Sequence, residues 1–155
     1  MSISTTTRRK NSRPRRTCCT GCIADSYLIG VGHAELLAGL FGELLIPPGV
    51  AVELADKGAP HAVREWIGQP PAWLGIRPLH SPPDAELMAA LDPGEREAIQ
   101  LTTEQKADVL IMDERRGRAI AQRRGLPLTG ALGVLGDAYQ RALRFEALLV
   151  TRYAR

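Results

Sequence analysis

The sequence predicts an α/β protein built around a parallel β-sheet, and three observations support this. From Leu91 to Leu135 the chain shows the patterns of a helix, a buried strand, an acidic turn, a helix, a short strand and a helix, which correspond to one and a half βαβ units. Residues 107–112 (ADVLIM) form a short, almost unbroken apolar run that contains β-branched residues, as in a parallel strand that is covered on both faces. The length of 155 residues, with 45% hydrophobic and 24% charged residues, is typical of one globular domain.

A helix is predicted to begin at Pro93. Asp92 suits the N-cap position, Pro93 suits the first helical position, and Glu95 lies three residues after the cap, as in a capping box. Apolar residues then follow at helical spacing in 98–101. This helix leads into the strand at 107–112.

An acidic turn follows that strand. Asp113 and Glu114 stand where open α/β sheets place their ligands, at the carboxyl end of a parallel strand, so both are site candidates. The next helix ends at Gly125, a suitable C′ residue, and carries three basic residues, Arg115, Arg116 and Arg118. These arginines are candidates for holding a substrate backbone, or are solvated residues that form pairs along the helix.

A third helix is predicted over 131–142, after an edge strand in 126–128. Thr129 and Gly130 open this helix, and the free N–H groups of a helix start can hold a phosphate oxygen. Thr129 is therefore a phosphate-binding candidate.

The N-terminal half is predicted to supply further strands and helices. The strands are expected at 22–25, 44–46 and 73–77, and the helices at 34–42, 49–57, 61–68 and 85–90. The first of these strands ends in a carboxylate, Asp25, and the helix at 49–57 carries another, Glu53.

The positive net charge of +3 comes from the start of the chain, where residues 8–16 hold six of the 20 basic residues. Without them, 14 basic residues face 17 acidic ones. Residues 1–20 lack hydrophobic periodicity and are predicted to be a disordered basic arm that precedes one domain at 21–155. The arm is either a solvated tail, including one from a misassigned start, or a contact for nucleic-acid phosphates.

Features of membrane and secreted proteins are missing from the sequence. No apolar run approaches the roughly 18 residues of a membrane span, and the polar start lacks the apolar segment of a secretory signal, so we expect a cytoplasmic protein without a membrane partner. Cys18, Cys19 and Cys22 are too few and too close for a disulfide framework. Cys19 and Cys22 have half of a zinc-site spacing.

Four segments together resemble the PIN domain family, in particular small prokaryotic PIN-like proteins predicted to bind nucleic acid. They are LFGELLIPPGVAVEL, GEREAIQL, ADVLIMDERRGRAIA and GLPLTGALGVL, and the resemblance spans roughly Ile23 to Leu143. It implies a three-layer α/β/α sandwich with a central parallel sheet of four to five strands.

The resemblance also implies a set of catalytic, metal-binding carboxylates: Asp25, Glu53, Glu95, Asp113 and Glu114. The second residue of the acidic turn, Glu114, aligns with the usual family aspartate. Other roles stay open, because Asp25 also suits an N-cap, Glu53 a solvated position and Glu95 a capping box. The family's proline after the first aspartate is absent here, and the following helix is about four residues short.

Carboxylates that converge in one cleft raise each other's pKa unless a cation neutralises them, and Mg²⁺ or Mn²⁺ is the cation expected with oxygen ligands. Such an ion can hold a phosphodiester oxygen and activate water for in-line attack. The resemblance implies a metal-dependent endoribonuclease acting on RNA. It also implies a toxin inhibited by an antitoxin encoded beside it, and a homodimer.

Three functions remain open from the sequence. The first is the Mg²⁺- or Mn²⁺-dependent ribonuclease. The second is a degenerate PIN-like module that binds nucleic acid or a partner protein without cutting, which the short first helix and Glu114 favour. The third is a regulator whose basic arm contacts DNA, although no helix-turn-helix signature is evident.

Overall fold

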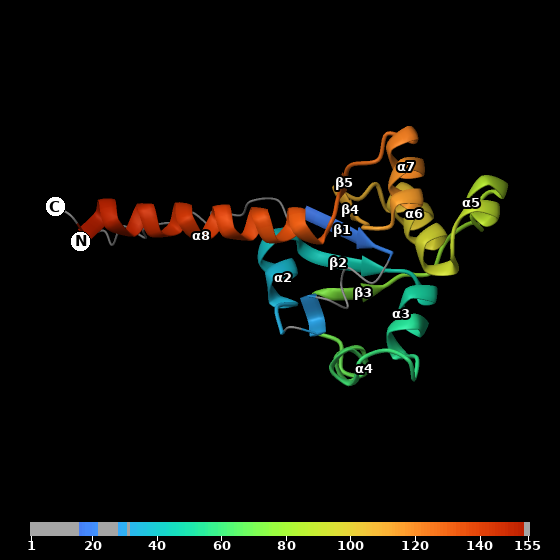
Figure 1. Ribbon diagram of the computed structural model, residues 1–155, viewed down its shortest axis with the longest axis horizontal. Helices are drawn as coiled ribbons and strands as arrows, with labels where there is room; N and C mark the ends of the chain where they lie inside the picture. Colours follow the sequence, from blue (N-terminus) through green and yellow to red (C-terminus); the bar gives the residue numbers. More distant parts are fainter. Residues whose placement is uncertain (1–15, 22–27, 31, 154–155) are drawn as a thin grey trace, which may run out of the picture.

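A five-stranded parallel sheet forms the centre of the protein (Figure 1). The structure, a computed structural model, describes residues 16–21, 28–30 and 32–153. The strand order is β3-β2-β1-β4-β5. The strands are β1 (Arg16–Thr20), β2 (Gly42–Ile46), β3 (Leu74–Ile76), β4 (Val109–Ile111) and β5 (Leu128–Thr129).

Helices cover both faces of this sheet. They are α2 (Glu35–Phe41), α3 (Pro48–Ala55), α4 (His61–Gly68), α5 (Ala85–Ala90), α6 (Pro93–Gln105), α7 (Arg115–Arg123) and α8 (Ala131–Tyr153). On one face Cys19, Leu45 and Leu110 pack against α5, α6 and α7. On the other face Cys18, Leu44 and Ile111 pack against α2 and the start of α8, and Ile46 packs with α3 and α4. The three-layer α/β/α sandwich expected from the sequence is confirmed.

Most helix boundaries follow the local signals in the sequence. Asp84 caps α5 by accepting a hydrogen bond from the Leu87 N–H at 3.0 Å. Pro93 begins α6 after Asp92, although the Asp92 side chain makes no capping hydrogen bond. Gly125 follows α7 with a φ of +69°, which glycine adopts without steric cost.

The first strand lies earlier than the sequence predicted. It is β1, Arg16–Thr20, so the prediction that the arm reaches residue 20 is wrong for these five residues. The arginines obscured a strand signal in Thr17, Cys18 and Cys19, whose cysteines are fully buried between β2 and β4. Residues 22–25, the predicted strand, lie outside the described part of the chain.

The last helix is longer than predicted. α8 continues past residue 142 to Tyr153, and Figure 1 shows it running out beyond the rest of the domain. After Gly136 the chain has neither glycine nor proline up to residue 153 and is rich in alanine, leucine and arginine, which favour helix. In the described residues, no helix combines the length and apolar character needed to cross a membrane.

Candidate functional site

The carboxyl ends of the strands bring several predicted site segments to one edge of the sheet. Thr20 of β1 is paired with Ile111 of β4, so the carboxyl ends of these two strands lie side by side. Gly21 lies against the first turns of α6: a Cβ built on it would be 2.6 Å from the Ala98 Cβ and 3.3 Å from the Glu95 Cα. Glycine therefore allows the end of β1 to approach Glu95.

Glu95 is half-buried in the first turn of α6 and has negative neighbours. Desolvation by burial raises its pKa, a hydrogen bond from the Asp92 N–H lowers it, and the charges of Glu114, Asp92 and Glu53 raise it, with a net increase. The charges of Glu53, Asp92 and Glu114 therefore lie close enough to Glu95 to act on it. We refer to these four residues as the acidic rim.

Glu53 reaches the acidic rim from α3. Its pKa is also raised: desolvation raises it, a hydrogen bond from the Gly94 N–H lowers it, and the charges of Asp92 and Glu97 raise it. The Gly94 nitrogen lies 3.2 Å from the Glu53 Oε1, one residue before Glu95. Much of the Glu53 side chain is exposed, so water weakens the desolvation effect. Glu53 is thus anchored at α6 rather than an isolated solvated residue.

The two residues of the acidic turn point to different partners. Glu114 caps α7 by accepting a hydrogen bond from the Arg116 N–H at 3.1 Å, and its charge acts on Glu95. Asp113 instead accepts a hydrogen bond from the Ala131 N–H at the start of α8, at 3.0 Å to Oδ1 and 3.3 Å to Oδ2. From the sequence we expect one role for both residues, whereas in the structure they have different partners.

The chemistry of the rim suits a divalent cation, although the described side chains form no complete metal site. Its donors are carboxylate oxygens whose like charges raise the pKa of Glu95, and a cation would relieve that repulsion. Within the described residues, no three His, Cys, Asp or Glu side chains are arranged as a metal-binding cluster. Asp25, the remaining predicted ligand, lies outside the described residues.

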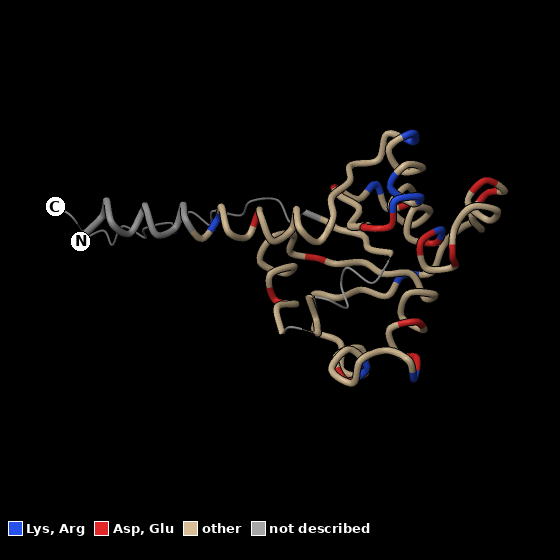
Figure 2. Tube along the Cα trace, in the orientation of Figure 1, with Lys and Arg blue, Asp and Glu red and all other residues tan. Residues whose placement is uncertain are grey.

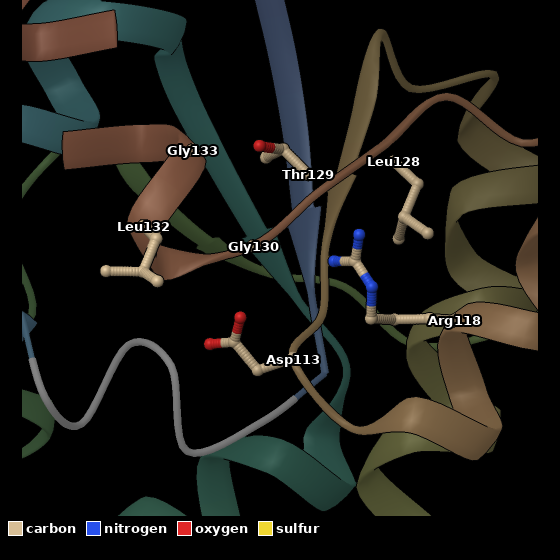
Figure 3. Close-up of a pocket in the computed structure, with 7 residues that line it drawn as sticks. All are labelled: Asp113, Arg118, Leu128, Thr129, Gly130, Leu132 and Gly133. Carbon is tan, nitrogen blue, oxygen red and sulfur yellow. The ribbon is translucent and has the colours of Figure 1, made fainter. Parts of the chain in front are cut away.

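A pocket of about 350 Å³ adjoins Asp113 (Figure 3). Its lining includes two predicted substrate-binding residues, Arg118 and Thr129, and the exposed Leu132. Figure 3 shows the Asp113 carboxylate and the Arg118 guanidinium turned toward the backbone at Gly130. A Cβ at Gly130 would meet both the Asp113 Oδ1 and the Arg118 Nη1, so this space depends on glycine.

The arginines of α7 differ in their surroundings. Arg118 is half-buried and donates a hydrogen bond from Nη1 to the Met112 carbonyl oxygen at 2.7 Å, which fixes it beside the pocket. Arg115 and Arg116 are exposed, and none of the three forms an ion pair with another described residue. Figure 2 shows these basic positions on α7 close to acidic ones. Unpaired arginines beside the rim can meet an anionic chain.

The described cysteines do not provide a metal site. Cys18 and Cys19 are fully buried in β1 and face opposite sides of the sheet. Burial raises the pKa of the Cys19 thiol to about 11, with a lowering effect from the Thr102 hydroxyl and a raising effect from Glu43. Cys19 lies inside the sheet, and Cys22, the other member of the half zinc site that the spacing suggested, lies outside the described residues.

Sequence reasoning did not assign Asp92 or Gly130 to the site. The sequence predicts Asp92 only as a helix cap, yet its charge acts on both Glu53 and Glu95. A capping aspartate three residues before a candidate ligand was the available signal. No local pattern showed that Gly130 would lie against Asp113, because that contact depends on the pairing of β4 with β5.

Residues 20–148 match the model of a family described as PIN domain. This range contains the acidic rim, the pocket and every described strand except most of β1. No curated protein matches the chain.

Proposed function

Because the chain belongs to the PIN domain family, whose members are generally nucleases that use divalent metals, we propose that it is an endoribonuclease dependent on Mg²⁺ or Mn²⁺. The observation that supports this most is the acidic rim, where three α-helices bring carboxylates to the carboxyl edge of the sheet and raise the pKa of Glu95. Carboxylates that repel each other at a sheet edge are stabilised by a hard cation, which can in turn hold an anionic substrate.

The proposed cation ligands are Glu53, Glu95 and Glu114, together with Asp25. When bound there, the ion would hold a phosphodiester oxygen and lower the pKa of water for attack at phosphorus. Asp113 was also a predicted ligand, but its hydrogen bond to the start of α8 favours a role in positioning the pocket. The hydrogen bond of Glu53 with the Gly94 N–H would orient its carboxylate beside Glu95.

Arginines and the pocket would bind the RNA chain. Arg115 and Arg116 are exposed next to the rim and would attract backbone phosphates, a contact independent of base sequence. Arg118 and Thr129 would hold a phosphate or sugar in the pocket next to Asp113. The substrate would then pass from α7 across the rim with its scissile phosphate near Glu95 and Glu114.

The cellular role that we propose is that of a toxin, inhibited by an antitoxin encoded by a neighbouring gene and active as a homodimer. This role rests on the family resemblance. Growth arrest on expression of the wild-type chain, relieved by expression of the neighbouring gene and absent for Glu95→Gln, is the expected result. Unimpaired growth with ample folded protein would contradict it.

A second candidate is a PIN-like module that binds RNA without cutting it. Two observations favour it: the absence of a three-ligand cluster among the described residues, and the use of the Asp113 carboxylate as a helix cap. In this case the arginines and pocket would still bind the chain, but no cleavage would follow.

Cleavage of a mixed RNA pool tests the two candidates. The nuclease should produce fragments with Mg²⁺ or Mn²⁺ and none with EDTA, and Glu95→Gln and Asp25→Asn should abolish cleavage while leaving the fold intact by circular dichroism. Glu35→Gln, which removes an exposed acid on α2, is the matched control and should cleave normally. Retarded but uncut RNA in gel-shift assays under all metal conditions would support the binding module and overturn the nuclease.

A further inference from the structure

The helices α3 and α6 each place a glutamate carboxylate against the first turn of the other. The Glu53 Oε1 accepts a hydrogen bond from the Gly94 N–H of α6 at 3.2 Å. In return, the Glu97 Oε2 of α6 accepts one from the Gly49 N–H of α3 at 2.9 Å. We call these four residues, Gly49, Glu53, Gly94 and Glu97, the reciprocal clasp.

The sequence builds the two halves of the clasp in the same way. Each helix opens with Pro-Gly, at Pro48-Gly49 and Pro93-Gly94, and then presents a glutamate three or four residues later, on the same helix face as the glycine. Each carboxylate therefore meets the positive end of the partner helix, where a charge-assisted hydrogen bond is favourable.

The glycines make these contacts possible. A Cβ built on Gly49 would lie 2.6 Å from the Glu97 Oε2, and one built on Gly94 would lie 2.7 Å from the Glu53 Oε2. A larger residue at either position would displace the carboxylate. The clasp therefore depends on both Pro-Gly starts and both glutamates.

From this geometry we infer that Glu97 is a positioning residue for the proposed metal centre: by holding α3 against α6, it sets where Glu53 lies relative to Glu95. This inference rests on the proposed function, because Glu53 and Glu95 are ligands only if that function is correct. Glu97 accepts its hydrogen bond from Gly49 and would influence the metal ligands through the position of α3, whereas Glu53 and Glu95 belong to the acidic rim itself.

Binding of Mn²⁺ alone to the full chain, followed by electron paramagnetic resonance, tests the inference. Because residues that orient metal ligands typically contribute about 10- to 100-fold to affinity, Glu97→Ala should raise the Mn²⁺ dissociation constant by a factor in that range. Gly49→Ala should act in the same direction, and Glu97→Gln, which keeps an acceptor oxygen, should retain more affinity than Glu97→Ala. Glu35→Ala removes one exposed negative charge and should leave the constant unchanged.

The amide proton resonances of Gly49 and Gly94 supply a second measurement, independent of metal and activity. Loss of a charge-assisted hydrogen bond should move the Gly49 resonance upfield in Glu97→Ala. A purely structural role would lower the unfolding midpoint of Glu97→Ala but leave its Mn²⁺ dissociation constant within twofold of wild type, and that result would overturn the inference. Wild-type protein that binds no Mn²⁺ would overturn the metal centre as well, whereas an unshifted Gly49 resonance would overturn the clasp alone.

Discussion

The carboxylate of Asp113, at the end of β4, accepts a hydrogen bond from the backbone N–H of Ala131, the first residue of α8. This bond joins the turn that follows β4 to the start of α8, the longest of the described helices. Glu114, the other acidic residue of the turn, acts on Glu95 instead, so the two residues divide between a positioning role and the acidic rim.

Replacing Asp113 should therefore affect stability more than chemistry. Asp113→Ala removes an acceptor at a helix start and should lower the free energy of unfolding by about 1 kcal/mol, measured by urea denaturation. Asp113→Asn keeps an acceptor oxygen and should cost less. Retention of RNA cleavage by Asp113→Asn is expected, and its complete loss with a native unfolding curve would show that Asp113 is a ligand.

Adding a methyl group at Gly21 should separate β1 from α6. The built Cβ lies 2.6 Å from the Ala98 Cβ and 3.3 Å from the Glu95 backbone, neither of which can rotate away. Gly21→Ala should lower the free energy of unfolding by about 1–3 kcal/mol. The comparison is Gly39→Ala on α2, where no atom lies within 4 Å and helix propensity should add up to about 1 kcal/mol. Equal effects at the two positions would contradict the close approach of β1 to α6.

Glu104 should make stability depend on pH in acid. Desolvation raises its pKa, but hydrogen bonds from the His80 N–H, from Gln100 and from the Ser81 N–H and hydroxyl lower it, to about 2. Because the folded pKa is below the unfolded one, this stabilisation is complete above the unfolded pKa of about 4.5 and is lost as the pH falls toward 2.

Urea denaturation between pH 6 and pH 2 measures this dependence. The free energy of unfolding of the wild type should fall more steeply below about pH 4.5 than that of Glu104→Gln. Parallel pH profiles for the two proteins would show that the loop at His80 and Ser81 is not held by the Glu104 charge.

Glu95→Gln should raise stability at neutral pH while abolishing cleavage. The pKa of Glu95 is raised in the folded protein, so its ionised form is less favourable there than in the unfolded chain. The amide removes that charge and can still accept the hydrogen bond from the Asp92 N–H. Thermal unfolding in EDTA should show a higher midpoint for Glu95→Gln. A lower midpoint would mean that the charge stabilises the fold and that the acidic rim is not electrostatically strained.

Much of the fold could be predicted from local sequence signals. The aspartates before the helix starts, Asp84 and Asp92, together with Pro93 and the apolar run ending at Met112, predict the starts of α5 and α6 and the place of β4. β1 was misplaced because its burial comes from pairing with strands distant in sequence, while its own residues look like part of a basic arm.

The sequence suggests candidate site residues but does not predict the contacts between them. Strand ends and the family resemblance suggest Glu53, Glu95 and Glu114, and in the structure the charges of Glu53 and Glu114 act on Glu95. The different orientation of Asp113 follows from the start of α8, and the partnership of Glu97 with Gly49 follows from helix packing. Neither relationship leaves a pattern within a single segment.

Titration of Mn²⁺ against the wild-type chain and Glu95→Gln tests the central claim, that the acidic rim is a divalent-metal site. The account predicts saturable loss of the free-Mn²⁺ resonance signal with the wild type, and binding at least about tenfold weaker for Glu95→Gln. Binding of equal affinity by the two proteins, or no binding by the wild type, would contradict it.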